Sequence, residues 1–471
     1  MTIATVVSPF RQGIFWHLAL LSLLVLWLSA CEKKEENQGN DNSEPPSDTP
    51  YEQYGQPFSN IPQTAELVIY EVNLRAYSPE GDLRGVIARL DEIKALGVNV
   101  IWLMPIHPVG QEKGINSPYC IRNYKAVAAE YGSLSDLRAL TDEAHKRGMA
   151  VIMDWVANHT AWDHPWISNK NWYTQDSNGN IVHPPGTNWQ DVADLNYDNQ
   201  QMRNAMLDAM FYWPYAANID GYRCDYADGV PYDFWQTAID SIEKVTGRNL
   251  IWFAEGSKKT HFVAGFDLCF GWHFYGTLKS VWQGDEPIKL ISAHDQEYQN
   301  TPAGKHWLRF TTNHDESAWD ATPVSIFNGN NGALAASVIS IFTGGAVLIY
   351  GSQEVGTNNN IPFFSNSLIN WSANPEMKEA YEEILAFYNS SDAARYGNIT
   401  ASTAFPDVLI FEKSYEGEEI AVIVNVRNQN SKVGRPSELA GINWQNVLTG
   451  QAVNLGNVIS LAPYEYLVLK N

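Results

Sequence analysis

The residues best suited to chemistry stand at the ends of apolar runs. Arg223 and Asp225 close the run "IDGYRCD" at 219–225. Alternate residues of a strand point to the same side, so the guanidinium can pair with the carboxylate. An opposite charge at this range lowers the pKa of an Asp by about 1–3 units, which keeps it ionised. An ionised Asp can act as a nucleophile, and a buried structural salt bridge is the alternative interpretation.

A second carboxylate, Glu255, closes the next apolar run, "NLIWFAE" at 249–255. Its neighbours are apolar and aromatic, and desolvation raises the pKa of a carboxyl group, which suits a general acid. Glycosidases use such a pair of carboxylates, one ionised and one protonated. If Asp225 and Glu255 stand about 5–5.5 Å apart, the pair indicates a retaining, double-displacement mechanism.

Further polar side chains lie at the ends of other apolar runs. Asp154 lies near the end of "MAVIMDWV", where it is a natural second partner for the guanidinium. His314 and Asp315 follow in "TTNHDE", and His159 follows in "ANHT". Carboxylates and imidazoles at such positions can bind sugar hydroxyls and stabilise positive charge that develops on a sugar ring.

The apolar runs alternate with amphipathic stretches from Leu67 onward. Two of these stretches, 83–97 and 133–148, predict helices, the second with Ser133 or Ser135 as its N-cap. Eight buried strands separated by helices predict a closed α/β architecture, the (β/α)8 TIM barrel, with a doubly wound sheet as the competing architecture. The predicted strands span 67–73, 98–105, 149–156, 219–225, 249–255, 266–270, 306–313 and 346–350. In such a barrel, the polar strand ends meet at one face.

One connection is much longer than the others. Residues 159–199 form a Gly-, Pro- and Trp-rich loop after the third strand, which predicts a short inserted subdomain over the barrel mouth. After Tyr388, strands follow one another without helices, which predicts a C-terminal all-β sandwich. The predicted domains are therefore a catalytic barrel over 63–388 and a β-sandwich over 389–471.

Six short segments together resemble the α-amylase superfamily, family 13 of the glycoside hydrolases. "MDWVANH", "DGYRCD", "FAEG" and "FTTNHD" resemble four of its characteristic regions, and "VADLN" and "GGAVLIYGSQE" resemble two flanking segments. The segments occur in the family's order and on the expected strands. The resemblance spans Leu67 to Glu354, and the β-rich tail resembles the family's C-terminal domain.

The resemblance implies a role for each matching residue. Asp225 is similar to the nucleophile, Glu255 to the acid/base, and Asp315 to the residue that stabilises the transition state. Substrate-binding positions are matched by Arg223, His159, His314, Asp154 and Tyr119, the last being similar to an aromatic residue that stacks under the sugar in "SPYCIRNY".

The sequence departs from the family pattern after Asp225. Many α-amylases carry Lys-His where this chain has Asp228 and Gly229. Asn158 and Asp194 match two positions of the family's calcium site, and the main-chain carbonyl of Gly229 would be a third ligand. The resemblance therefore implies a structural calcium ion, while the chemistry itself requires no cofactor.

The expected substrate is an α-glucan oligo- or polysaccharide. The resemblance implies retaining hydrolysis of mainly α-1,4 bonds in starch, maltodextrins or related glucans, through a covalent glucosyl-Asp intermediate. Transglycosylation and α-1,6-glucosidase activity are the nearest alternatives. A surface glucan-binding protein without catalysis is an alternative of another class.

The composition limits the partners. The formal net charge of −22 disfavours nucleic acid and anionic membrane surfaces, because phosphate contacts need a basic face. The cysteines Cys120, Cys224 and Cys269 have no metal-binding spacing. They are predicted to be buried free thiols, with one disulfide and one free thiol as the alternative.

The first part of the chain has the pattern of a targeting segment followed by a linker. Arg11 precedes an apolar run that ends in "LSAC", which is typical of a secretory signal peptide over 1–30. The motif resembles a bacterial lipobox, which implies cleavage before Cys31 and acylation of its thiol. The polar stretch 31–62 predicts a flexible, lipidated tether. The protein is thus expected in the bacterial cell envelope, lipid-anchored to the outer membrane. The short "KKEE" after Cys31 resembles a surface-export signal, which implies an outward-facing protein, with a periplasmic one as the alternative. An uncleaved transmembrane anchor is the alternative.

Overall fold

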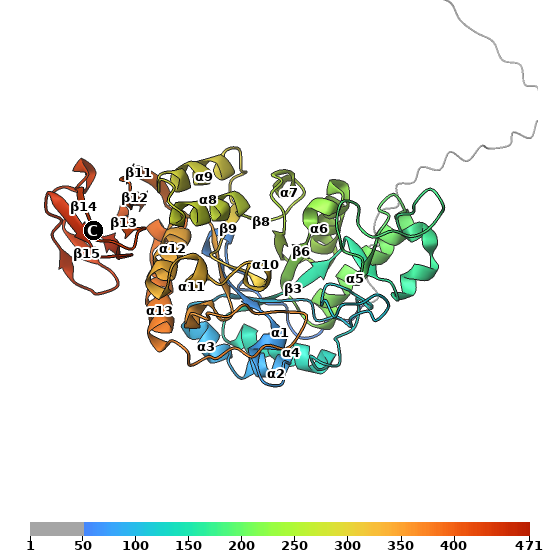
Figure 1. The fold of residues 1–471 in the computed structure, drawn as a ribbon. Helices are drawn as coiled ribbons and strands as arrows, with labels where there is room; N and C mark the ends of the chain where they lie inside the picture. The colour runs from blue at the N-terminus through green and yellow to red at the C-terminus, as the bar shows by residue number, and fades with distance from the viewer. Residues whose placement is uncertain (1–50) are drawn as a thin grey trace, which may run out of the picture. The chain divides into compact units, whose positions relative to one another are not determined.

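A computed structural model describes residues 51–471 (Figure 1). The predicted signal peptide, Cys31 and most of the predicted tether lie outside these residues. Within the described part, no helix is both long enough and apolar enough to cross a membrane.

Eight parallel strands close into a barrel, in the order β1-β10-β9-β8-β7-β6-β3-β2. This ring confirms the predicted (β/α)8 barrel and excludes the doubly wound sheet. Most strands are shorter than the predicted runs, because residues at the ends of these runs do not form the hydrogen bonds between neighbouring strands. The strands are β1 (Val68–Val72), β2 (Val100–Leu103), β3 (Ala150–Val156), β6 (Gly221–Asp225), β7 (Ile251–Ala254), β8 (Leu268–Phe270), β9 (His306–Arg309) and β10 (Ala346–Tyr350).

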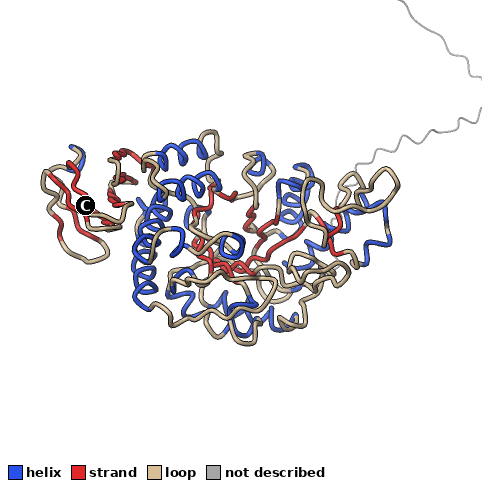
Figure 2. Tube along the Cα trace, in the orientation of Figure 1, coloured by secondary structure: helices blue, strands red, loops and turns tan. Residues whose placement is uncertain are grey.

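Helices connect the strands and surround the barrel (Figure 2). The predicted helix 83–97 is two short helices, because Arg89 leaves the helical conformation at φ −114° and ψ 9°. The other predicted helix is capped by Ser133, which forms a reciprocal capping box with Asp136. The helices are α1 (Leu74–Tyr77), α2 (Leu83–Ile87), α3 (Leu90–Ala95), α4 (Leu134–Lys146), α5 (Gln200–Ala216), α6 (Tyr232–Thr246), α7 (Thr260–Val263), α8 (Trp272–Trp282), α9 (Lys289–Tyr298), α10 (His314–Trp319), α11 (Pro323–Ile326), α12 (Asn330–Thr343), α13 (Pro375–Ser390) and α14 (Asp392–Tyr396).

The barrel interior changes from apolar to charged along the strands. Ile69, Ile152 and Phe253 belong to an apolar core inside the barrel. Side chains two residues further along a strand point the same way. At that next level the chain carries carboxylates, namely Glu71, Asp154 and Glu255. Strand geometry therefore places a layer of charged groups at the C-terminal ends of the strands.

The long connection after β3 contains a small antiparallel pair, β4 (His159–Ala161) and β5 (Val192–Asp194). Two 3-10 turns, Pro165–Ser168 and Lys170–Trp172, lie between these strands. Cys120 packs on the pair in a small buried cluster. It is a free thiol, as are the other two cysteines of the described residues, so the predicted buried thiols are confirmed.

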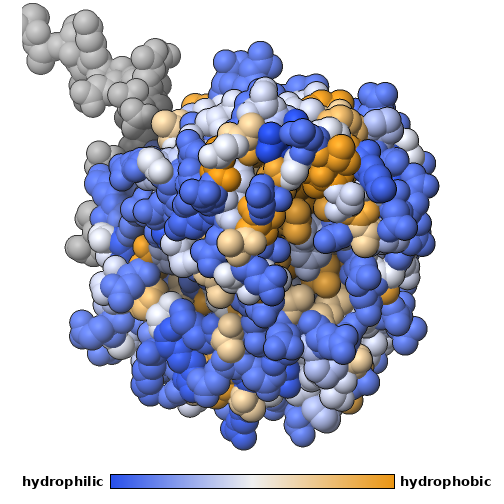
Figure 3. All heavy atoms as spheres, turned by 90° about the vertical axis from the view of Figure 1, so that its left-hand side faces the viewer, coloured by the Kyte–Doolittle hydropathy of each residue, from blue (hydrophilic) through white to orange (hydrophobic). Residues whose placement is uncertain are grey.

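The C-terminal part is antiparallel from Asn398 onward, as predicted, but the predicted all-β segment 389–471 also contains the helix α14. A six-stranded sheet, in the order β11-β12-β13-β18-β15-β16, packs on the two-stranded sheet β14-β17 through a core that contains Ile410 and Ile459. Leu409 and Phe411, which alternate with Ile410 along the same strand, pack in the large core around the barrel instead. The outer surface of this region is mostly hydrophilic, with scattered apolar patches (Figure 3). The strands are β11 (Asn398–Ala404), β12 (Val408–Tyr415), β13 (Glu418–Asn425), β14 (Ser431–Gly434), β15 (Trp444–Asn446), β16 (Ala452–Val453), β17 (Val458–Leu461) and β18 (Tyr466–Lys470).

The described end of the predicted tether packs on the barrel. The N–H of Tyr54 donates to the carbonyl of Tyr215 at 2.8 Å, and its hydroxyl donates to Asp142 at 2.7 Å. Phe58 stacks on His145 with ring centroids 4.6 Å apart. The tether was predicted to run to residue 62 from its polar composition, but these aromatic residues bind the segment to the barrel from residue 51 onward.

Candidate active site

A cavity of about 730 Å³ opens at the C-terminal ends of the barrel strands. This volume is typical of small-molecule sites. The cavity is lined by six of the residues predicted from the sequence, namely Tyr119, His159, Asp225, Glu255, His314 and Asp315. Arg223 and Asp154, also predicted, are buried and contact this set.

Arg223 is the buried centre of the site. Its side chain is fully shielded from solvent. Nη1 lies 2.8 Å from Asp154 Oδ1 and 3.0 Å from Asp225 Oδ1. Nη2 lies 2.9 Å from Glu255 Oε1, outside hydrogen-bond alignment. One guanidinium thus draws three carboxylates together, and Asp225 and Glu255 approach its two terminal nitrogens.

The predicted direction of the pKa shift of Asp225 is wrong. Burial raises the pKa of Asp225 well above its ordinary range, and the positive charge of Arg223 only opposes this shift. Glu255 and Asp154 add negative charge that raises the pKa further. Because Arg223 is shared among three carboxylates, its single charge does not outweigh burial at one of them.

Glu255 has more polar surroundings than the sequence predicts. Besides its contact with the guanidinium, Oε2 accepts a 2.7 Å hydrogen bond from the N–H of Tyr226. Tyr226 has a left-handed backbone, at φ 40° and ψ 47°, which a non-glycine residue rarely adopts. This turn after β6 directs the N–H of Tyr226 at the Glu255 carboxylate. The strained backbone of Tyr226 therefore helps to position a hydrogen-bond donor in the site.

A chain of hydrogen bonds joins the opposite rim to Arg223. The Tyr119 hydroxyl lies 3.1 Å from Asp154 Oδ2 and 2.7 Å from His314 Nε2. Asp154 Oδ2 also accepts from the indole N–H of Trp102 at 3.2 Å. Tyr119 is therefore tied into the charged layer by its hydroxyl, while its ring lines the cavity.

His314 begins α10 and bonds to a carboxylate that sequence reasoning did not single out. Its Nδ1 is hydrogen-bonded to Glu71, which is wholly buried on β1. Burial alone would lower the pKa of His314, but the negative charges of Asp315 and Glu71 raise it to about 9. A Glu within the otherwise apolar run "LVIYEV" was the signal that could have identified this residue.

His159 differs from His314 in charge. Burial lowers the pKa of His159 to about 4, so its imidazole is neutral at neutral pH. Its ring contacts Trp189 edge-on, with centroids 5.7 Å apart, and both residues line the cavity. The inserted connection therefore supplies one wall of the site, with a neutral imidazole on it.

An aromatic wall stands on the other side of the cavity and was not predicted. Trp319, at the end of α10, is 64% exposed although it lines the cavity. Its ring contacts Phe363 and Phe364 edge-on, with centroids 5.7 and 5.4 Å apart. Exposed aromatic rings beside a polar cleft can stack on flat ligands such as sugar rings.

Comparison with known proteins places this site in a family. The model of the α-amylase catalytic domain matches residues 37–268. The α-amylase MalA of Haloarcula japonica is 26% identical over 420 residues, which cover 84% of this chain and 60% of that protein. The chain belongs to the α-amylase superfamily. A solved α-amylase from Lactobacillus plantarum matches with a TM-score of 0.78 and 26% identity, over 87% of this chain and 99% of that one.

Other similar proteins are named for different activities. A probable oligo-1,6-glucosidase of Bacillus subtilis is 32% identical over 201 residues, which is 34% of either chain. This chain thus spans 60% of the length of MalA and about a third of the oligo-1,6-glucosidase. These matches establish the family, within which the similar proteins are named for more than one reaction.

The departure from the superfamily pattern forms a compact polar cluster. Asp228 Oδ1 lies 2.6 Å from His261 Nε2, and Lys258 donates to the Asp228 carbonyl at 2.8 Å. Burial opposes ionisation of Asp228, but His261 and Lys258 hold its pKa below the ordinary value. A Cβ on Gly256 would stand 2.7 Å from both interacting atoms. The loop after β7 therefore supplies a cation and an imidazole next to the Asp.

The calcium site implied by the resemblance contains one carboxylate, Asp194, beside the Asn158 amide and the Gly229 carbonyl. Asn158 directly precedes β4, and Asp194 ends the paired strand β5, so their backbones are close. However, the Asn158 amide contacts His159 at 3.3 Å. Residues 51–471 contain no group of three or more His, Cys, Asp or Glu side chains that could hold a metal. Ca²⁺ takes about 6–8 oxygen ligands, most of which would have to be amide, main-chain or water oxygens here, and no step below depends on the ion.

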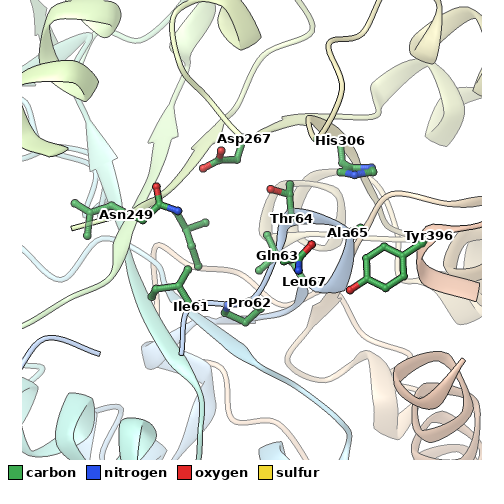
Figure 4. Close-up of a pocket in the computed structure, with 13 residues that line it drawn as sticks. Ile61, Pro62, Gln63, Thr64, Ala65, Leu67, Asn249, Asp267, His306 and Tyr396 are labelled. Atoms are coloured by element: carbon green, nitrogen blue, oxygen red, sulfur yellow. The ribbon is translucent and has the colours of Figure 1, made fainter. Parts of the chain in front are cut away.

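A second cavity, of about 380 Å³, lies near the N-terminal ends of β7, β8 and β9 (Figure 4). Its carboxylate, Asp267, is already paired with Lys305 at 2.9 Å and with the N–H of Trp252 at 3.0 Å. The Tyr396 hydroxyl likewise donates a hydrogen bond to Glu66. The polar groups of this cavity serve the fold, so the cavity with the paired carboxylates is the candidate active site.

Proposed function

We propose that the protein is a retaining glycosidase that cleaves α-glucosidic bonds, mainly α-1,4, in starch, maltodextrins or related α-glucans. The observation that carries this proposal is the approach of Asp225 and Glu255 to the two terminal nitrogens of Arg223, in one cavity. Two carboxylates held side by side suit a double displacement, whereas an inverting enzyme needs room for water between them.

In the first step, Glu255 donates its proton to the glycosidic oxygen while an Asp225 oxygen attacks the anomeric carbon. The glycosidic C–O bond breaks, the leaving sugar departs as an alcohol, and a glucosyl ester of Asp225 forms. In the second step, Glu255 takes a proton from water, the water oxygen attacks the anomeric carbon, and the ester bond breaks. Asp225 leaves as a carboxylate and Glu255 is protonated again.

Other groups stabilise the charge that develops between these states. Asp315 is 40% exposed at the cavity, next to the imidazole of His314. Its negative charge suits an oxocarbenium-like transition state, in which the sugar ring becomes positive. Arg223 stabilises the ionised form of Asp225, which is the form that attacks and the form that is released.

The test is release of reducing sugar from starch by the wild type and by Asp225→Asn. We expect the variant to lose at least about 10³-fold in kcat, because the amide cannot form the covalent ester, and to keep its affinity for maltotriose. Proton NMR of the first anomer released should show the α configuration. Activity that persists in Asp225→Asn, or release of the β anomer, would contradict the mechanism. A wild type that binds glucan without releasing sugar would favour the alternative of a surface glucan-binding protein without catalysis.

The second candidate is an α-1,6-glucosidase or a transglycosylase. The similarity to an oligo-1,6-glucosidase and the replacement of Lys-His by Asp228 and Gly229 favour it. A product profile on starch, pullulan, isomaltose and cyclodextrin separates these activities. Preferred cleavage of isomaltose would favour α-1,6 action, and products longer than the substrate would show transfer to sugar in place of water.

A further inference from the structure

Glu71 is a buried carboxylate that the proposed chemistry does not use. It lies in β1, all of whose residues are buried, and its own exposure is 0%. One oxygen is hydrogen-bonded to His314 Nδ1, and the other has no hydrogen-bond partner among the described residues. A buried carboxylate is costly unless a cation pairs with it. Burial raises the pKa of Glu71, and the positive charges of His314 and Arg223 oppose this shift. Of these two groups, His314 is the one hydrogen-bonded to Glu71.

With Glu71 and Asp154 ionised, the hydrogen bonds around His314 call for two donors on its ring. The Tyr119 hydroxyl has one proton, and its neighbour Asp154 Oδ2 can only accept. Tyr119 therefore donates to Asp154 and accepts from His314 Nε2, at 2.7 Å. Nδ1 in turn faces Glu71. An imidazole that donates from both nitrogens is an imidazolium.

The charges around this imidazole come from each element packed on it. Glu71 faces it from β1, Asp154 lies beyond Tyr119 on β3, and Asp315 Oδ2 lies 3.5 Å from Nε2. The positive charge of Arg223, on β6, opposes protonation. The nearby rings of Trp102 and Phe363 contribute no charge. The carboxylates outnumber the guanidinium, which agrees with a pKa of about 9 for His314.

We propose that Glu71 is a positioning residue that holds His314 as an imidazolium, with Nε2–H directed at Tyr119 and the sugar-binding cavity. This inference rests on the proposed function for its sugar ligand. The consequence is a site that donates a charged hydrogen bond at neutral pH. Without the carboxylate, His314 would be neutral there and Nε2 would no longer be fixed as a donor.

The first experiment follows the imidazole directly, by NMR of histidine-labelled protein between pH 5 and 10. In the wild type His314, assigned through His314→Gln, should titrate near pH 9. In Glu71→Gln the midpoint should fall toward about 6.5, the ordinary value for His, because the amide keeps the shape without the charge, while Asp315 still faces Nε2. A wild-type midpoint at or below 6.5 overturns the proposal without any variant. An unchanged midpoint in Glu71→Gln overturns it as well.

The chain offers a matched control in Glu354. This Glu is also buried, accepts from the Tyr70 hydroxyl at 2.5 Å and lies outside the cavity. Glu354→Gln should therefore leave the His314 midpoint where it is, even if both variants lose stability. A control that shifts the midpoint as much as Glu71→Gln would assign the effect to general disturbance of the fold and overturn the proposal.

The second experiment links the imidazolium to sugar binding in the Asp225→Asn background, where turnover is blocked. Maltotriose affinity measured by calorimetry at pH 5.5 and pH 8 should be similar in Asp225→Asn alone. Adding Glu71→Gln should weaken binding at pH 8 by about 10-fold and by less than about 3-fold at pH 5.5, since only the higher pH then neutralises His314. Equal weakening at both pH values contradicts the inference. Absence of maltotriose binding in Asp225→Asn contradicts the proposed function instead, and the NMR titration still tests Glu71.

Discussion

At the scale of single residues, the site depends on how one positive charge is divided. Arg223 serves Asp154, Asp225 and Glu255 at once. Considered as a pair in the sequence, Arg223 and Asp225 indicated a lowered pKa, but the structure adds two carboxylates and removes the solvent. The guanidinium therefore aligns the carboxylates, and its charge does not outweigh the effect of burial on the pKa of Asp225.

A residue-scale prediction concerns Asp228. In the proposed mechanism Glu255 protonates the leaving oxygen, so residues beside it would face the leaving sugar. Asp228 lines the same cavity as Glu255. Asp228→Asn should lower kcat/KM for maltotetraose by at least about 10-fold, because a hydrogen bond to a charged group contributes about 1.5–3 kcal/mol. An aryl α-glucoside, which has no leaving sugar, should be hydrolysed within about 2-fold of the wild-type rate.

The matched control for this prediction is Asp233→Asn. Asp233 is an Asp near the start of α6 that pairs with Arg203 at the surface. Its variant should hydrolyse both substrates at wild-type rates. If Asp228→Asn slows both substrates equally, Asp228 acts on the reacting carboxylates and not on the leaving sugar.

At the scale of elements, the barrel and the position of its polar rim could be predicted from the sequence. Apolar runs that end in charged residues are local patterns, and parallel strands bring their ends to one face, as Asp225 and Glu255 show. Trp319 and Glu71 could not be assigned in this way. Trp319 reaches the cavity because α10 follows β9 after four further residues, and Glu71 contacts His314 only because β1 closes the ring beside α10. Both depend on contacts between distant segments, which local patterns do not contain.

An element-scale prediction concerns the loop after β7. A Cβ on Gly256 would stand 2.7 Å from Asp228 Oδ1 and from His261 Nε2, closer than real contacts allow. Gly256→Ala should therefore separate these two side chains and reproduce the substrate dependence of Asp228→Asn. Gly276→Ala, in the open part of α8, meets no neighbour. It should raise stability by about 0.5–1 kcal/mol and leave the kinetics unchanged. Thermal unfolding measures the stability of both variants, and kcat/KM on maltotetraose and the aryl α-glucoside measures their kinetics. Unaltered maltotetraose hydrolysis in Gly256→Ala would contradict the prediction for that variant.

At the scale of the whole molecule, the described chain combines a catalytic barrel with sheets that share its core. Alternate residues of β12 face the barrel side and the small sheet β14-β17, so both faces of the strand are buried. The segment from residue 51 is likewise bound to the barrel through Tyr54 and Phe58. Any tether that precedes it would then join the barrel at a fixed point.

The whole-molecule prediction concerns attachment to a membrane. With a net charge of −22, the protein is repelled by anionic lipid surfaces, so attachment would have to come from a lipid on the chain itself. We propose Cys31 as its site, and expect labelled palmitate to enter the wild type expressed in a bacterium but not Cys31→Ser. Cys31→Ser should also be absent from the membrane fraction. Cys120→Ser, which changes a buried thiol packed on the β4-β5 pair, should keep the label. Label retained in Cys31→Ser would place the lipid elsewhere, and an unlabelled wild type in the membrane fraction would favour an uncleaved apolar anchor.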